Sequence, residues 1–333
     1  MKMLSMQATI KTHSHAEKSM KSMMQNLLAA ILLLSCWRNP SFAQTHKNPA
    51  GEKSDTKLAQ KLHAALKDFR GDAGVYVRHL PSGRSVAIRA DELFPPASMI
   101  KVPIMLALFE KFNAGEWDYH SDLVYLDSLL YEGEDLLGSF KNGEKIAFSK
   151  VVMLMITTSD NTASLWCQSL AGKGMTINNW LEARGFHQTR VNSRTEGREE
   201  ARKEFGWGQT TPREMAELLV MIRERRAVSP AASDEMYRAL TRIYWNNEAL
   251  SQIPPHVQAA SKQGAVNRSR SEVVLVNAPS GDYVFCLITK NQQDESWEYN
   301  NEGYALTRKV SRLLWQHFDP KSQWEPAEGF EKW

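Results

Sequence analysis

Cysteine is scarce in this chain of 333 residues, which contains three. Cys36 lies in an apolar segment near the N-terminus, so the body of the protein retains Cys167 and Cys286. That number is too small for a disulfide-based scaffold. Both residues sit in apolar stretches, ASLWCQSL and YVFCLITK, where a small buried thiol is the common state. We therefore expect two free, buried cysteines.

The chain also lacks an excess of basic residues outside its first segment. Its formal net charge is +3, but five of the 41 basic residues and one of the 38 acidic residues lie in 1–43. The remainder has 36 basic and 37 acidic side chains. Binding of nucleic-acid phosphates depends on clustered positive charge. Nucleic acid is therefore not an expected partner.

No hydrophobic run is long enough to cross a membrane. The longest, Asn26–Trp37, has an apolar core of about ten residues, and a spanning helix needs roughly 20. Lysines precede this run, and the small-x-small sequence Ser-Phe-Ala follows it at 41–43. These features predict a signal peptide over residues 1–43, of ordinary length if translation starts at Met20. We expect an exported protein, periplasmic or secreted.

A lipid anchor is the alternative for this leader. Leu33-Leu34-Ser35-Cys36 resembles the lipobox of bacterial lipoproteins, in which the cysteine is lipidated and becomes the new N-terminus. Leucine two positions before the cysteine is not the favoured residue there, and the cleavage site at 41–43 is clear. Plain export is therefore the preferred interpretation, with lipidation of Cys36 as the second.

Sequence motifs for metal, phosphate and dinucleotide binding are missing. The histidines after residue 43 are all more than ten residues apart, which excludes a helical two-histidine zinc motif. No P-loop, G-x-G-x-x-G or G-x-S-x-G sequence occurs. We expect neither a metal site nor a cofactor.

The pattern along the chain predicts an α/β (α+β) fold. A polar linker over 44–54 precedes a first amphipathic helix, and alternating runs around Pro81-Ser82-Gly83 predict a hairpin. Helical patterns fill most of 98–226, two strands return over about 271–290, and an amphipathic helix covers 303–317. One antiparallel sheet flanked by the terminal helices, with a mostly helical lobe beside it, fits this order. The last residues, 319–333, form a polar tail.

The most informative residues are Ser98 and Lys101. At positions i and i+3 on a helix, the lysine amine can reach the serine hydroxyl. A partly desolvated lysine has a lowered pKa and can act as a base. A second S-x-x-K sequence, Ser54–Lys57, lies in the polar linker and is interpreted as chance. Ser98 instead follows Phe-Pro-Pro-Ala and begins a strongly apolar helix, which suits a fixed nucleophile.

Two further motifs follow in order along the chain. Ser159-Asp160-Asn161 ends an apolar segment, and Lys262-Gln263-Gly264 precedes the late strands. S-x-x-K, S-D-N and K-T-G together mark class A β-lactamases and penicillin-binding proteins. From these motifs, their spacing and their flanks (FPPASMIKVPI, KIAFSKVVMLMITTSDNTA), the chain resembles a class A serine β-lactamase over residues 55–318. Asp160 is expected to cap and brace its loop.

The resemblance implies a role for each motif residue. Ser98 would attack the lactam carbonyl, and Lys101 would accept its proton directly or through water. Ser159 would pass a proton to the leaving nitrogen, and Lys262 would hold Ser159 and the substrate carboxylate. The implied substrate-binding residues are Asn161, Gln263, Gly264 and Ala265, with the backbone N–H groups of Ser98 and Ala265 forming an oxyanion hole. Arg268 or Arg270 would add positive charge beside the carboxylate.

Glu196 is the predicted base for deacylation. It stands in an R-x-E sequence with Arg194, at the chain position where the family carries this glutamate. The alternative is a solvated charged loop, since the surrounding sequence is RTEGREEARKE. Gly197 and Glu200 replace the proline and asparagine typical of the family, and Gln263 replaces the usual threonine or serine. We therefore expect slow hydrolysis or an unusual substrate.

The sequence leaves three functions open. The first is an exported, monomeric β-lactamase that confers β-lactam resistance. The second is a penicillin-binding serine peptidase or esterase of the same fold. The third is a protein that binds β-lactams without turnover. Glu196→Ala should accumulate acyl-enzyme under the first function and change little under the other two.

Overall fold

The computed structural model describes residues 52–133 and 135–332. The predicted signal peptide, the alternative lipid site at Cys36 and most of the predicted linker lie outside these residues. Lys53 and Ser54, predicted as the end of the linker, instead form strand β1 (Lys53–Ser54), parallel to β3. Within the described part no helix is long and apolar enough to cross a membrane.

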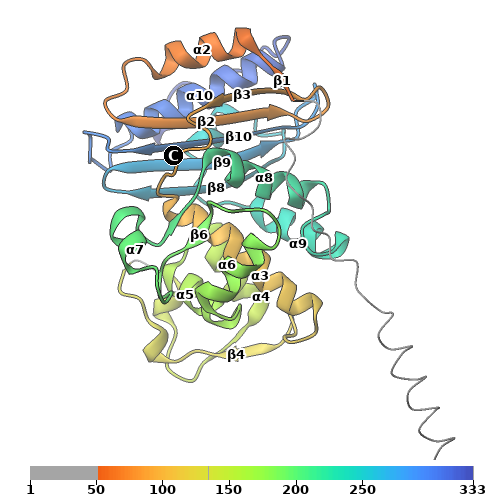
Figure 1. The fold of residues 1–333 in the computed structure, drawn as a ribbon, viewed down its shortest axis with the longest axis vertical. Helices are drawn as coiled ribbons and strands as arrows, with labels where there is room; N and C mark the ends of the chain where they lie inside the picture. The colour runs from red at the N-terminus through yellow and green to blue at the C-terminus, as the bar shows by residue number, and fades with distance from the viewer. Residues whose placement is uncertain (1–51, 134, 333) are drawn as a thin grey trace, which may run out of the picture. The chain divides into compact units, whose positions relative to one another are not determined.

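A six-stranded sheet with the order β1-β3-β2-β10-β9-β8 organises the described chain (Figure 1). The predicted hairpin is confirmed, since β2 (Asp72–His79) pairs with β3 (Arg84–Ile88) in antiparallel register. Strands β9 (Ser269–Val276) and β10 (Tyr283–Lys290) come from the end of the chain, and β10 pairs with β2. β8 (Ala259–Val266), which carries the Lys-Gln-Gly motif, is the edge strand.

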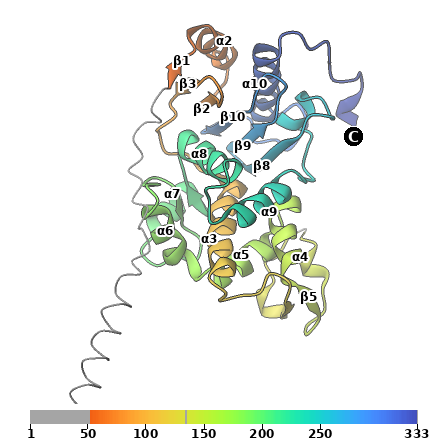
Figure 2. The ribbon, with the colours of Figure 1, turned by 90° about the vertical axis from the view of Figure 1, so that its right-hand side faces the viewer.

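Helices cover both faces of this sheet (Figure 2). Because side chains alternate along a strand, Val75 and Val77 face one way and Tyr76 the other. The first pair packs in a core with α2 (Thr56–Leu66) and α10 (Glu302–Phe318). Tyr76 joins a second core with α8 (Pro212–Arg223), in which Thr211 caps the helix and Pro212 occupies its first turn. The predicted flanking of the sheet by the terminal helices is confirmed.

The helical lobe is built around α3 (Lys101–Asn113), whose first nine residues are all buried. Pro103 falls in its first turn, where a missing N–H costs no helical hydrogen bond. The neighbouring helices are α4 (Phe148–Met153), α5 (Asn161–Leu170), α6 (Lys173–Glu182), α7 (Glu199–Phe205) and α9 (Pro230–Leu240). Two short strand pairs complete this region. They are β4 (Asp122–Val124) with β5 (Lys145–Ala147), and β6 (Arg190–Val191) with β7 (Gly208–Gln209).

The two cysteines are free and buried, as predicted. Cys167 lies in α5 and Cys286 in the central strand β10. Burial raises the pKa of both thiols, so they stay protonated at neutral pH. Both act as small apolar core residues.

Candidate active site

Ser98 lies on a short 3-10 turn, Ala97–Ile100, that leads directly into α3. Edge strand β8 runs close past the backbone of this turn at Gly264. A Cβ atom built on Gly264 would lie 2.4 Å from the carbonyl oxygen of Pro96 and 2.7 Å from the backbone nitrogen of Ser98. Glycine is therefore required for β8 to approach the serine, and Ala265 follows it along the edge.

Lys101 begins α3 one turn after Ser98, and its side chain is completely buried. Its amine donates to Oγ of Ser159 over 3.1 Å, to Oδ1 of Asn161 over 2.8 Å, and to the Ser159 carbonyl oxygen. Burial lowers the Lys101 pKa to about 7, an effect that the charges of Asp135 and Asp160 partly offset. A large fraction of the amine is therefore neutral near pH 7 and can accept a proton.

Lys262 approaches Ser159 from β8. Its amine donates to Oγ of Ser159 over 3.1 Å and to Oε1 of Gln263 over 2.9 Å. Desolvation by complete burial, followed by the nearby charge of Lys101, holds the Lys262 pKa well below its ordinary value. The structure therefore gathers both lysines around the Ser159 hydroxyl.

The backbone at Ser159 is in the left-handed conformation, with φ of 63°. It follows a π-helical turn, Leu154–Thr158, that ends the α4 segment. Asp160 holds the next turn, as predicted, because its carboxylate accepts from the backbone N–H of Ala163 (2.7 Å) and of Leu137 (2.8 Å). A strained backbone of this kind persists only where its surroundings fix it, and it commonly occurs at functional sites.

Two adjoining hollows meet at Ser98, Asn161 and Ala265, which line both. The loop-side hollow, of about 620 Å³, is lined further by Tyr131, Glu204, Phe205, Trp207, Arg268 and Asn291 among others. The sheet-side hollow, of about 670 Å³, includes Asp135, Ser159, Trp245, Gln263, Gly264, Arg270, Glu272 and Trp297. A fixed serine with two buried lysines and a second hydroxyl can carry out nucleophilic acyl transfer.

Comparison with known proteins agrees with this geometry. The sequence profile of the Beta-lactamase enzyme family matches residues 57–318. The chain belongs to this family. The predicted enzyme class, a hydrolase of the β-lactamase type, and the predicted fold are thereby confirmed.

Individual members of the β-lactamase family are distant in sequence. Beta-lactamase VEB-1 of Pseudomonas aeruginosa is 19% identical over 272 residues, which cover 78% of this chain and 90% of that protein. The structure of PBP-A has 26% sequence identity and a TM-score of 0.72, over 81% of this chain and 98% of PBP-A. A β-lactamase structure from Sphaerobacter thermophilus has 22% identity and a TM-score of 0.69, over 79% and 97%.

The position of Glu196 differs from what its proposed role requires. Its side chain is exposed, and Glu196 is not among the residues that line either hollow around Ser98. The preceding Thr195 packs its side chain on Gly174 of α6. Among the described carboxylates of this loop, Glu204 is the one that lines the loop-side hollow, and deacylation by Glu196 stays a prediction.

A different arginine ties the loop together. Arg194, the arginine of the R-x-E sequence, is exposed and has a positive φ of 47°. Arg198 instead donates to Oδ1 of Asn192 over 3.0 Å and to the side-chain oxygen of Gln209. Two side-chain amide oxygens, one of Asn192 and one of Gln209, thus accept from Arg198.

Sequence reasoning missed several cavity residues. Tryptophan is usually largely buried, but Trp245 is 46% exposed and lines the sheet-side hollow. Its indole N–H donates to the Thr158 carbonyl oxygen over 2.8 Å. Glu272 is fully buried beside β8, where it accepts from Oγ of Ser261 (2.6 Å) and from the Ala249 N–H (2.9 Å). Neither residue belongs to a sequence motif, because tertiary contacts bring each of them to the cavity.

Arg270 is also fully buried, but its guanidinium is already engaged. It donates to the carbonyl oxygens of Val266, Ser269 and Ser296 and lies between the rings of Trp297 and Tyr304. This arrangement fixes Arg270 as part of the wall of the sheet-side hollow. Within residues 52–133 and 135–332, no cluster of three or more His, Cys, Asp or Glu side chains is arranged to hold a metal.

Proposed function

We propose that this member of the β-lactamase family forms an acyl-enzyme with β-lactams on Ser98 and hydrolyses it slowly. The observation that carries the proposal is the convergence of the Lys101 and Lys262 amines on Oγ of Ser159, in the cavity that Ser98 lines. This arrangement supplies a base, a proton carrier and a nucleophile within one site.

Acylation proceeds in two proton-coupled steps. Neutral Lys101 accepts the hydroxyl proton of Ser98, directly or through water, as Oγ bonds to the lactam carbonyl carbon. Backbone N–H groups of Ser98 and Ala265 stabilise the resulting oxyanion, where one donor is typically worth about 100- to 1,000-fold in rate. The C–N bond then breaks, and Ser159 passes its proton to the leaving nitrogen. Ser159 regains a proton from its lysine neighbours.

Substrate binding uses the polar groups around these residues. Oδ1 of Asn161 accepts from Lys101, which leaves its amide N–H groups to donate to the acyl side chain of the substrate. Oε1 of Gln263 accepts from Lys262, so the Gln263 amide N–H groups can bind the substrate carboxylate. Gln263 thereby replaces the hydroxyl donor that is usual at this position.

Deacylation separates the two leading functions. A β-lactamase needs a carboxylate that activates water, and Glu196 lies outside the cavity. This exposure supports the second candidate, a penicillin-binding enzyme with a long-lived acyl-enzyme. The likeness to PBP-A, a mutant of which has been solved as an acyl-enzyme complex with penicillin G, supports the same candidate.

The cellular setting is proposed from the sequence. A leader over 1–43 would export the enzyme to the periplasm or beyond, as a monomer, with lipidation of Cys36 as the alternative. A role in β-lactam resistance follows only if deacylation is fast enough to remove antibiotic.

The decisive experiment follows colour and protein mass together when the chain from Gln44 onward is mixed with a chromogenic cephalosporin. Sustained colour without a lasting adduct would identify a β-lactamase. One equivalent of colour and a persistent adduct on Ser98 would identify a penicillin-binding enzyme. Ser98→Ala is the control and should give neither signal. Absence of both signals from the parent chain would overturn the proposal.

A further inference from the structure

The segment Asp319–Lys332, here called the C-terminal strap, follows α10 and lies outside the residues matched by the family profile. Two of its residues, Glu331 and Lys332, nevertheless line the sheet-side hollow that Ser98 also lines. We propose that the strap is a specificity-determining wall of the active site, which limits the size of the amine side of the substrate. The proposal rests on acyl transfer at Ser98.

The strap is held at its start by the hairpin between β9 and β10. The carboxylate of Asp319 accepts from the backbone N–H of Ser280 over 3.2 Å and from its hydroxyl over 2.9 Å. Further on, Glu325 forms an ion pair with Arg312 on the exposed side of α10. These contacts turn the chain back along α10 rather than away from the protein.

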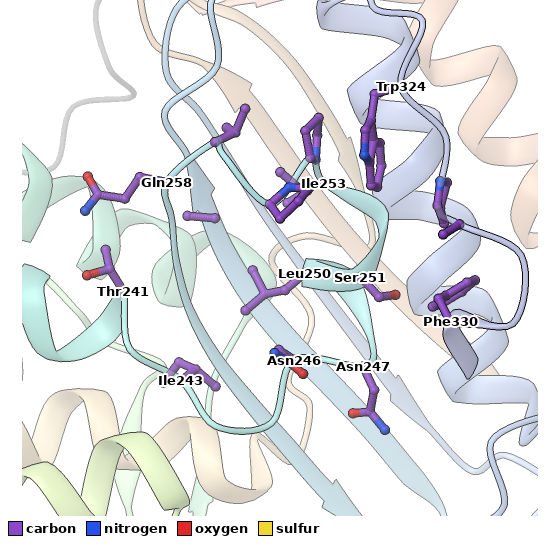
Figure 3. Close-up of a pocket in the computed structure, with 16 residues that line it drawn as sticks. Thr241, Ile243, Asn246, Asn247, Leu250, Ser251, Ile253, Gln258, Trp324 and Phe330 are labelled. Carbon is purple, nitrogen blue, oxygen red and sulfur yellow. The ribbon is translucent and has the colours of Figure 1, made fainter. Parts of the chain in front are cut away.

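Aromatic contacts hold the second half of the strap. Phe330 meets Tyr299 edge to face, with ring centroids 6.2 Å apart. Trp324 and Phe330 also line a separate hollow of about 530 Å³, across from Leu250 and Ile253 (Figure 3). Phe330 thus packs between two hollows, and the short 3-10 turn Phe330–Lys332 is fixed on the side of the active site.

The strap borders one side of the substrate only. In the proposed mechanism Ser159 protonates the leaving nitrogen, and Ser159 lines the sheet-side hollow but not the loop-side hollow. The amine side of the substrate therefore occupies the sheet-side hollow, and the acyl side occupies the loop-side hollow beside Tyr131. Glu331 and Lys332 line only the first of these.

Apart from the contacts of Asp319, Glu325 and Phe330 described above, the strap lies at the surface. Trp324 and Phe330 are half-buried, whereas Glu331 and Lys332 are exposed on their outer sides. Removing the strap should therefore widen the sheet-side hollow while leaving Ser98, Lys101 and Ser159 unchanged. A chain ending at Lys321 retains Asp319 and its bonds to Ser280.

The test compares two cephalosporins that share one acylamino side chain. One carries a methyl group at C3, and the other a bulky aromatic substituent there, on the amine side. The second-order rate constant for acylation of Ser98 is measured for both compounds with the full chain and with the chain ending at Lys321. We expect the ratio of bulky to small compound to rise at least tenfold on truncation, with the small compound changed less than threefold.

A point variant tests the same proposal in case the truncated chain misfolds. Phe330→Ala removes the contact with Tyr299 and should raise the same ratio at least threefold, whereas Glu328→Ala, on an exposed strap residue, should leave it unchanged. If the ratio of bulky to small compound stays within twofold of the parent value in the truncated chain and in Phe330→Ala, the strap does not limit substrate size. The proposed function would still stand. Failure of both compounds to acylate any of the proteins would overturn the proposed function and this inference with it.

Discussion

Lys101 and Lys262 donate to the same atom, Oγ of Ser159, each over 3.1 Å. Two ammonium groups this close repel each other, and both are removed from water, so the site favours loss of a proton from the pair. The charge of Lys101 contributes directly to the lowered Lys262 pKa. Ser159 therefore lies between two amines with lowered pKa values. In the proposed mechanism these amines return a proton to Ser159 after it has protonated the leaving nitrogen.

The pH dependence of acylation should follow Lys101. Its pKa is lowered to about 7, so the amine is protonated and inactive as a base below that pH and neutral above it. We expect the acylation rate constant to rise about tenfold per pH unit from pH 5 to 7 and to level off above pH 8. Stopped-flow measurement with a chromogenic cephalosporin gives this profile.

Lys101→Arg provides the matched control, because a guanidinium keeps its charge at every pH used. This variant should lose about 100- to 10,000-fold in acylation and show no inflection near pH 7. A parent profile that is flat between pH 5 and 9 would contradict the assignment of Lys101 as the base.

Glu196→Ala should leave deacylation within threefold of the parent. Its side chain is exposed and outside both hollows, so removing the carboxylate does not alter the water around the acyl-enzyme. The lifetime of the adduct is measured by intact mass, with Glu199→Ala as the exposed neighbour control. Accumulation of acyl-enzyme in Glu196→Ala alone would restore the role expected from the sequence. Glu204→Gln should have a larger effect than Glu196→Ala.

Gly264→Ala should disable the site. The new methyl group would lie 2.4 Å from the Pro96 oxygen and 2.7 Å from the Ser98 nitrogen, so β8 has to move away from the serine. Misplacing the Ala265 N–H should cost about 100- to 1,000-fold in acylation, and overpacking about 1–3 kcal/mol of stability. Asn267→Ala, on an exposed residue directly after the same strand that lines neither hollow, is the control. Acylation by Gly264→Ala at the parent rate would refute the close approach.

Glu272→Gln should stabilise the protein at higher pH. Burial raises the Glu272 pKa to about 7 from its ordinary value of 4.5. The folded state therefore holds a proton that the unfolded state releases between these values, and the stability from this group is lost as pH rises from 4.5 to 7. An uncharged glutamine keeps partners for Ser261 and Ala249 without this loss. Urea unfolding should show a gain on the order of 3 kcal/mol at about pH 8 relative to about pH 4.5. A pH-independent difference would contradict the shift.

The sequence identifies the motif residues that share the cavity because their order and spacing are linear features. Four motif residues are recognisable from the sequence alone: Ser98, Lys101, Ser159 and Lys262. Hydrogen bonds join Lys101 and Lys262 to Ser159, and Ser98 lines the same cavity. The position of Glu196 could not be obtained in this way. A motif fixes a place in the chain, whereas the exposure of a side chain depends on how its loop packs in the folded protein.

Local patterns also fail to predict one strand. β8 carries Lys262 and Gly264 in a sequence without the regular alternation that predicts a strand, and it is defined by its pairing with β9. The usual burial of tryptophan would place Trp245 in the core, but a backbone acceptor at Thr158 holds it at the cavity. Both errors arise where long-range contacts override local preference.

The left-handed turn at Ser159 has a consequence for folding. Its oxygen meets amines that lie 58 and 103 residues away along the chain, so the constellation exists only after the helical lobe and the sheet have docked. Such distant contacts are closed late because loop-closure entropy must be overcome first. Covalent labelling of Ser98 is therefore a kinetic probe of the final docking step, and it should lag behind the recovery of helical circular dichroism during refolding.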